Sequence, residues 1–324
     1  MNRNICDHEY CNKIKYGIES DAVRYTWAGY FLFILTSSLI GDTAILIASI
    51  KYRAFKLHGV IVVIIQHIAV CDLMVSLTDV LSKLVSLLAN RWATGTLLCY
   101  LSTYAKFYFV PAGTLLICTM TTCKVLLLKF PCRFGMTTVK QAHLICAACW
   151  MVTLLNPIAI LIADGNDVYF SYRNYQCDHG YSTKNRYWLR PCLAAIFGFL
   201  PTCLVVATTA ILLIIAKRFA NRGRANLKWQ GITTILLTAA VYCISVLPLV
   251  AGRVAESIVK VEDKSQSFLH MVFYRLALSF IFLNTISNFF IYSLTLPSFR
   301  KFIRKRMHLP IPHFSSTTST SHGK

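Results

Sequence analysis

The sequence is poor in charged residues, and above all in acidic ones. Only 14% of its 324 residues are charged, with 13 Asp and Glu against 33 Lys and Arg. A soluble domain carries about 25% charged residues, so a water-facing globular surface is excluded for most of this chain. The hydrophobic share of 56% and the mean hydropathy of +0.56 instead require lipid as the solvent.

Seven long apolar segments account for this composition. They run over residues 27–50, 60–88, 95–128, 142–163, 188–216, 231–254 and 268–296. A helix rises about 1.5 Å per residue, so a segment of roughly 20 residues crosses a hydrocarbon core about 30 Å thick. Strands of that length would leave unpaired edges in lipid. The sequence therefore predicts an all-α membrane protein, a seven-transmembrane helix bundle over residues 27–296.

Acidic residues are absent from one set of loops, and this absence predicts the orientation. The loops after the first, third and fifth apolar segments, and the C-terminal segment, contain Lys and Arg but no Asp or Glu. Cytoplasmic loops are rich in Lys and Arg, so this face is expected inside the cell and the N-terminal tail, residues 1–26, outside. The net charge of +20 then faces the anionic lipid of a bilayer. This placement excludes nucleic acid as a partner and is typical of a multi-pass plasma-membrane protein.

Several functional motifs are also missing. The chain contains no Asn-x-Ser/Thr sequon, so N-glycosylation is not expected. No nucleophile–base or metal-ligand constellation is visible, so neither an enzyme nor a cofactor is expected. A transporter usually shows repeats or paired Gly/Pro breaks, and without them a transporter or channel is the remote alternative. The spacing of Cys146 and Cys149 is that of a redox or zinc motif, but both lie inside an apolar segment, where cysteine acts as a small hydrophobe.

A series of short motifs resembles the rhodopsin-like (class A) G-protein-coupled receptors. "GDTAIL" lies in the first segment, "IAVCDL" with Asp72 in the second, and "WATGTLLC" leads into the third at Cys99. Lys124 follows Cys99 by 25 residues, the family interval from the disulfide cysteine to the arginine of its Asp-Arg-Tyr motif. "LNTISNFFIYSLTLPSFRKF" resembles the Asn-Pro-x-x-Tyr motif and the helix after it. The resemblance covers nearly the whole chain and implies a receptor that signals to heterotrimeric G proteins.

The switch motifs of the family are altered in this chain. "CKV" around Lys124 replaces Asp-Arg-Tyr, Val246 stands at the tryptophan position of helix six, and Phe289 replaces the proline of Asn-Pro-x-x-Tyr. Lys124 keeps the positive charge without the planar donor fork of arginine, and Cys123 supplies no carboxylate to hold it. We therefore favour G-protein coupling through Lys124 and Tyr292 with raised basal activity. The alternatives are a scavenger or arrestin-linked receptor with weak coupling, and a Lys124 that only snorkels at the membrane interface.

Carboxylates inside the apolar segments are rare, so Asp42 and Asp72 indicate function. The resemblance places them with Asn284 and Asn288 in a polar relay that binds sodium near Asp72 in many members. Gly113 stands where such members often carry serine, which weakens the sodium prediction. Two facing carboxylates do not both ionise cheaply, so one is expected to be protonated near neutral pH. In the simpler alternative, a protonated Asp42 takes the place of the family's asparagine and serves only as a hydrogen-bonding group.

Basic residues are expected at the extracellular ends of the helices, where the family binds its ligands. The candidate ligand contacts are Lys106, Arg253, Arg190 and Arg275. Lys106 lies about 10 Å into the third helix, at the position where amine receptors carry an aspartate, so an amine ligand is disfavoured. Together the four could hold a carboxylate or phosphate. The alternative is internal pairing, of Asp79 with Lys83 four residues away, or of Asp79 with Lys106.

The segment that ends at Cys177 alternates polar and apolar residues after an Asp-Gly-Asn turn, which predicts a β-hairpin lid. The resemblance implies that a Cys99–Cys177 disulfide tethers this lid. Cys6 and Cys11, in the predicted extracellular tail, are candidates for a local pair. A lid with a short tail favours a short peptide ligand, with an acidic small molecule or lipid as the alternative.

Past the last apolar segment, apolar residues recur at helical spacing with Arg and Lys between them. This pattern predicts an amphipathic helix over residues 297–309 that lies on the inner leaflet. The Ser- and Thr-rich tail, residues 310–324, is expected to be disordered. Phosphorylation by a receptor kinase would let it recruit arrestin, while the alternative is an inert tail.

Overall fold

The computed structural model describes residues 21–51, 59–130, 132, 138–164, 168–171, 175–179, 189–221, 229–258 and 264–306. Cys6, Cys11 and the predicted disordered tail lie outside the described residues. The side chains of Arg190, Arg253 and Arg275 also lie outside the description, although their backbone is helical.

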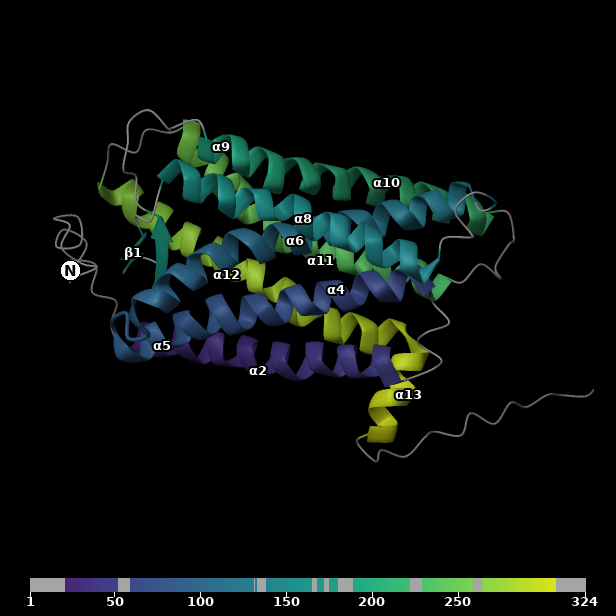
Figure 1. The fold of residues 1–324 in the computed structure, drawn as a ribbon, viewed down its shortest axis with the longest axis horizontal. Coiled ribbons are helices and arrows are strands. Elements are labelled where there is room, and N and C mark those ends of the chain that lie inside the picture. The colour runs from purple at the N-terminus through teal and green to yellow at the C-terminus, as the bar shows by residue number, and fades with distance from the viewer. Residues whose placement is uncertain are drawn as a thin grey trace, which may run out of the picture.

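The described part of the chain is mostly helical, and its long helices lie side by side in one bundle (Figure 1). The helices are α2 (Asp21–Lys51), α4 (Gly59–Val75), α5 (Leu81–Ala89), α6 (Gly95–Lys129), α8 (Val139–Asp164), α9 (Leu189–Ala194), α10 (Leu200–Asn221), α11 (Trp229–Ile258), α12 (Lys264–Thr295) and α13 (Pro297–Arg306). Two π-helical turns, η2 (Ser76–Val80) and η4 (Ala195–Phe199), join α4 to α5 and α9 to α10. Within the described ranges, six helices are long and apolar enough to cross a membrane.

The helices are longer than the apolar segments that predicted them. α2 begins at Asp21, inside the predicted extracellular tail, where Arg24 contacts Asp21 at 2.8 Å. An acidic residue in the first turn suits the positive end of the helix dipole, so the helix continues beyond its apolar part. α8 begins with a capping box, in which the Thr138 N–H donates to the Gln141 side chain at 2.8 Å and the Gln141 N–H donates to Thr138 Oγ1 at 3.3 Å.

The outward surface of the bundle is apolar. Leu97, Leu144, Ile162 and Leu294 are more than 70% exposed, as suits side chains that face lipid. Inside the bundle, polar side chains hydrogen-bond across neighbouring helices, a common source of cohesion between membrane helices. Tyr30 of α2 donates to the Ser279 carbonyl of α12 at 2.8 Å, and Asn156 of α8 donates to the Phe107 carbonyl of α6 at 2.7 Å. Trp150 of α8 donates to His67 Nδ1 of α4 at 3.1 Å.

The predicted hairpin is confirmed. Strand β1 (Val168–Ser171) pairs antiparallel with β2 (Gln176–His179), with Phe170 opposite Cys177 and Tyr169 opposite Asp178. The hairpin lies at the end of the bundle opposite α13 (Figure 1). Phe170 is buried against Trp92, with ring centres 5.7 Å apart, so the loop before α6 supports the hairpin.

Candidate functional site

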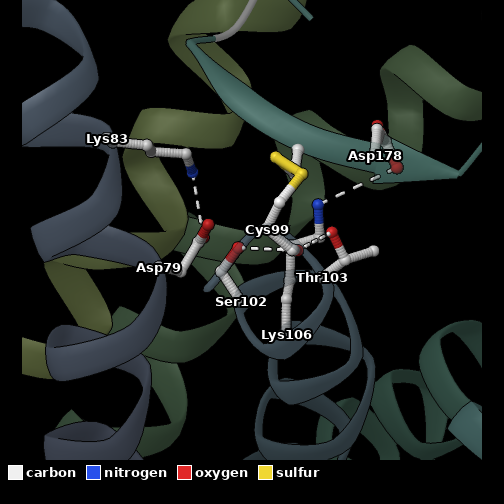
Figure 2. A network of polar contacts seen from close by, with 8 residues as sticks. Asp79, Lys83, Cys99, Ser102, Thr103, Lys106 and Asp178 are labelled. Atoms are coloured by element: carbon white, nitrogen blue, oxygen red, sulfur yellow. Dashed lines mark hydrogen bonds and ion pairs between the residues drawn. A yellow bond between two sulfur atoms is a disulfide. The ribbon is translucent and has the colours of Figure 1, made fainter. Parts of the chain in front are cut away.

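A disulfide joins the hairpin to the bundle. Cys177 of β2 is bonded to Cys99 of α6, as predicted, with a Cα–Cα distance of 5.4 Å. Both cysteines are buried. The bond fixes the residue next to Cys177, Asp178, over the same helix that carries Lys106 (Figure 2).

Two ion pairs flank this disulfide. The first joins Lys83 Nζ of α5 to Asp79 Oδ2 of η2 at 2.9 Å, and both side chains are about 5% exposed or less. A π-helical turn adds a residue to the helical turn, and Asp79 lies in the buried part of η2. The ammonium of Lys83 also lies 4.3 Å from the ring centre of Phe282 and 5.8 Å from that of Phe31. This charge pair is enclosed by aromatic rings and satisfied internally.

The second ion pair joins the bundle to the lid. Lys106 Nζ of α6 lies 3.9 Å from Asp178 Oδ1 of β2, and the two side chains are 17% and 26% exposed. Of the two internal pairings considered from the sequence, Asp79 with Lys83 is the one that forms. Lys106 finds its acid on the hairpin, and sequence reasoning missed this partner. The sequence did contain a signal for this partner, because Asp178 directly follows Cys177. A disulfide that joins Cys177 to α6 must bring Asp178 to α6 as well.

The predicted relay residues lie at the centre of the bundle. Asn288 Nδ2 of α12 donates to Asp72 Oδ2 of α4 at 2.7 Å. Ser76 donates to Ser38 at 2.7 Å, and Ser38 donates to Asp42 Oδ2 at 2.6 Å, which joins η2 to α2. The two serines were not identified from the sequence, although Ser38 lies one helical turn before Asp42.

Three buried acceptor oxygens of this relay accept no hydrogen bond among the described residues. They are Asp42 Oδ1, Asn284 Oδ1 and Asn288 Oδ1. Acceptors of this kind, one carboxylate and two amide oxygens, are hard ligands that suit a small cation, water or a carboxylic acid proton. By their chemical type, these oxygens suit a sodium ion, and they equally suit ordered water around a protonated Asp42.

A second hydrogen-bonded group joins three other helices. The hydroxyl of Tyr242, on α11, lies 2.9 Å from Thr202 Oγ1 of α10 and donates to Thr114 Oγ1 of α6 at 3.2 Å. All three side chains are buried. We call these three residues the tyrosine clasp. Sequence reasoning missed it, and the available signal was a set of hydroxyl side chains within otherwise apolar segments.

The two predicted coupling residues, Lys124 and Tyr292, lie nearer to α13 than the relay does. Tyr292 is 1% exposed and Lys124 9% exposed, so Lys124 is a buried residue of α6. Cys123 beside it is half-buried. A snorkelling lysine extends its ammonium into the interface, and the burial of Lys124 argues against this reading.

Comparison with known proteins agrees with this architecture. The chain matches the family model for the 7 transmembrane receptor (rhodopsin family) over residues 41–292. It is 24% identical over 186 residues to the mouse "Probable G-protein coupled receptor 63", covering 57% of this chain and 42% of that protein. It is 22% identical over 202 residues to the human "Cysteinyl leukotriene receptor 1", covering 61% of this chain and 58% of that protein. The matches thus span about half the length of these relatives. Since the family match extends over most of the chain and contains the disulfide, the relay and the tyrosine clasp, this protein belongs to the rhodopsin family of seven-transmembrane receptors.

Proposed function

We propose that the protein binds an extracellular ligand at the hairpin end of the bundle and signals to heterotrimeric G proteins at the α13 end. As a family member it is a multi-pass receptor of the plasma membrane and not an enzyme. In this proposal α12 is the seventh span, the N-terminus is outside, and α13 lies on the inner leaflet with Arg300, Lys301 and Arg304 toward lipid phosphates. The observation that carries it is the Asn288–Asp72 hydrogen bond, because it joins α12 to α4 in the relay between the two ends.

The ligand proposal rests on Lys106. Its side chain is partly exposed beneath the tethered hairpin, which supports an acidic group of a ligand as its partner. Arg253, Arg190 and Arg275 are the further candidate contacts. A short peptide is the favoured ligand because a hairpin lid suits an extended chain. The human relative is named as a receptor for cysteinyl leukotriene, which supports a small molecule as the second candidate.

Coupling is proposed to run through Lys124 and Tyr292. Asn288 donates to Asp72, and Asp42 accepts from Ser38, which supports a retained polar relay of Asp42, Asp72, Asn284 and Asn288 inside the bundle. Cys123 stands beside Lys124 in the sequence, where the family's Asp-Arg-Tyr motif has a carboxylate. The resting state therefore lacks the acid that holds the cation in other members, and basal activity is raised. The competing proposal is a scavenger receptor with weak coupling that acts through arrestin.

G-protein and arrestin recruitment, both measured in ligand-free cells, separate these proposals. Raised basal G-protein recruitment that falls on Lys124→Ala supports the favoured one. Recruitment at the level of empty vector, with arrestin still recruited after ligand, supports the scavenger. Ligand-independent ion or solute flux through purified protein in liposomes would instead indicate a transporter or channel.

The sodium and proton alternatives for the relay are separated by Asp42→Asn. This variant keeps a hydrogen-bond acceptor for Ser38 but removes one ionisable group. Signalling whose dependence on sodium and pH is unchanged supports the simpler role, in which Asp42 serves only as a hydrogen-bonding group. Loss of that dependence supports cation binding.

A further inference from the structure

Helix α6 carries a proline near its middle, at Pro111. Proline has no backbone N–H, and its ring collides with the carbonyl four residues back. In α6 that carbonyl belongs to Phe107, so it lacks the helical hydrogen bond that residue 111 would otherwise donate. A carbonyl left unpaired inside a bundle costs as much free energy as a lost hydrogen bond. The sequence of α6 therefore creates a demand for a donor at Phe107.

A side chain of the neighbouring helix meets this demand. Asn156 Nδ2 of α8 donates to the Phe107 carbonyl at 2.7 Å. Asn156 is only 4% exposed, so bulk water does not compete for the bond. Prolines are tolerated in membrane helices where a neighbouring helix satisfies the freed backbone group in this way. The buried donor thus lies at the one carbonyl that Pro111 frees.

Different partners hold the two halves of α6. On the hairpin side of Pro111, Cys99 is bonded to the hairpin by the disulfide. On the other side, Thr114 belongs to the tyrosine clasp, and Thr121 Oγ1 lies 2.8 Å from Thr208 Oγ1 of α10. A helix bends most easily where a backbone hydrogen bond is missing, and proline is the usual cause. The two halves of α6 can therefore change their angle at Pro111.

Helix α8 contacts the hairpin-side half of α6 at a second place. The ring of Trp150 packs on Tyr108 and Phe109, with ring centres 5.5 Å and 5.8 Å away. The Trp150 N–H donates to His67 at 3.1 Å, which fixes the direction of the indole. Aromatic contacts tolerate a range of angles and distances, whereas a hydrogen bond weakens steeply when it is bent. The bond from Asn156 therefore defines the angle of α6 more sharply than this packing does.

Phe107 also lies against the candidate ligand contact. Lys106 Nζ is 5.4 Å from the centre of the Phe107 ring, within the range of a cation–π interaction. We propose that Pro111 is a hinge in α6 and that Asn156 is a positioning residue, which fixes the angle of the hairpin-side half and with it the place of Lys106. The role of this angle in ligand recognition rests on the proposed function, but the hinge itself does not.

The test measures the angle of α6 in the full chain, purified in lipid nanodiscs. Spin labels are attached to p-acetylphenylalanine introduced at Leu97 of α6 and Tyr25 of α2, which are 81% and 55% exposed, so every cysteine is kept. Pulsed electron spin resonance gives the distribution of distances between the labels. Leu97 lies about 20 Å along the helix from Pro111, so a change of about 10° at the hinge moves its label by about 3 Å. We expect Asn156→Ala to broaden the distribution by about this amount.

A second substitution shows whether Asn156 acts through the freed carbonyl. Pro111→Ala returns an N–H to position 111, so Phe107 regains its helical partner and no longer needs Asn156. Pro111→Ala with Asn156→Ala should therefore give the same narrow distribution as Pro111→Ala alone. Thr153→Val is the matched control, because the buried Thr153 hydroxyl donates only to carbonyls of its own helix α8, and it should leave the distribution unchanged.

Two results would overturn the proposal. One is an Asn156→Ala distribution equal to that of the parent chain, and the other is a double variant as broad as Asn156→Ala.

Thermal unfolding of the same proteins is the second measurement. Asn156→Ala should lower the unfolding midpoint by about 2–5 °C, because it leaves a buried carbonyl unpaired. In the Pro111→Ala background the same substitution should have less than half of this effect. If Asn156→Ala prevents folding, recovery of folding in the double variant supports the proposal, and failure to recover contradicts it.

Neither measurement needs a ligand or a G protein, so this proposal and the proposed function fail separately. Label distances that respond as expected, in a chain that recruits no G protein, refute the coupling proposal alone. Basal G-protein recruitment by a chain whose label distances do not respond to Asn156→Ala refutes the hinge alone.

Discussion

Phe289 packs directly on the backbone of α2 at Gly41. A Cβ built on Gly41 would lie 2.7 Å from the Phe289 Cβ, closer than such atoms approach in proteins, and 3.0 Å from its Cγ. The Phe289 ring also meets Phe299 of α13 edge to face, with centres 6.0 Å apart. A residue that replaces the family's proline thus connects α12 to both α2 and α13.

We predict that Gly41→Ala destabilises the protein by about 1–3 kcal/mol, the usual cost of overpacking. Gly29→Ala is the matched control, because it lies in the same helix and has no atom within 4 Å of the added Cβ. That control should be neutral or stabilising by up to about 1 kcal/mol, since alanine is the better helix former. Thermal unfolding in nanodiscs measures both. Equal midpoints for the two variants would mean that α2 and α12 can move apart freely.

The tyrosine clasp predicts a restraint on α11. Tyr242→Phe removes the one hydroxyl that bridges Thr202 and Thr114, at a cost of about 1–2 kcal/mol. If the clasp holds the resting arrangement of α6, α10 and α11, ligand-free G-protein recruitment should rise. Tyr25→Phe, at an exposed position, is the control. A Tyr242→Phe variant that is less stable yet has unchanged basal recruitment would give the clasp a purely structural role.

The buried pair of Asp79 and Lys83 predicts a strongly non-additive double substitution. Lys83→Met leaves the carboxylate of Asp79 buried without its partner and should cost about 3–5 kcal/mol. Asp79→Leu should cost a similar amount for the same reason. The double variant should recover most of the loss, because neither charge remains. Unfolding midpoints of the four proteins complete the cycle, and simple addition of the two single effects would show that the pair is not coupled.

Lys124 predicts how the resting state can be strengthened. Cys123→Asp with Lys124→Arg restores the family's acid and its planar cation, so the carboxylate can hold the guanidinium at rest. Basal G-protein recruitment should fall at equal surface expression. Lys124→Arg alone is the control, since it changes the cation without supplying the acid. If the double variant signals at the original level, the missing acid is not the reason for raised basal activity.

Long apolar segments, the hairpin and the Asp79–Lys83 pair could all be predicted, because each depends on residues close together in the sequence. Helical periodicity brings residues four apart onto one face, and alternation with a turn predicts a hairpin. The Cys99–Cys177 bond required the family interval, since spacing alone does not determine which cysteines pair.

The contacts between distant residues could not be predicted in this way. The partner of Lys106 depends on how the hairpin folds over α6, which the disulfide and the packing of Phe170 on Trp92 determine together. The tyrosine clasp depends on the rotation of three helices, and one of them, α10, follows the π-helical turn η4 that the apolar pattern does not indicate. The contact of Gly41 with Phe289 depends on the distance between two helix backbones.

The substitution at Phe289 also bears on the mechanics of α12. Phenylalanine keeps the backbone N–H that proline would lack, and no proline occurs between Lys264 and Thr295. The hydrogen-bond ladder of this helix, about 48 Å long at 1.5 Å per residue, therefore has no kink of the kind that proline causes. A helix without a proline kink resists bending more and transmits displacement more nearly as a stiff rod. A push at the hairpin end of α12 would then reach Tyr292 as a tilt or rotation of the whole helix, with Gly41 as the point on which it pivots.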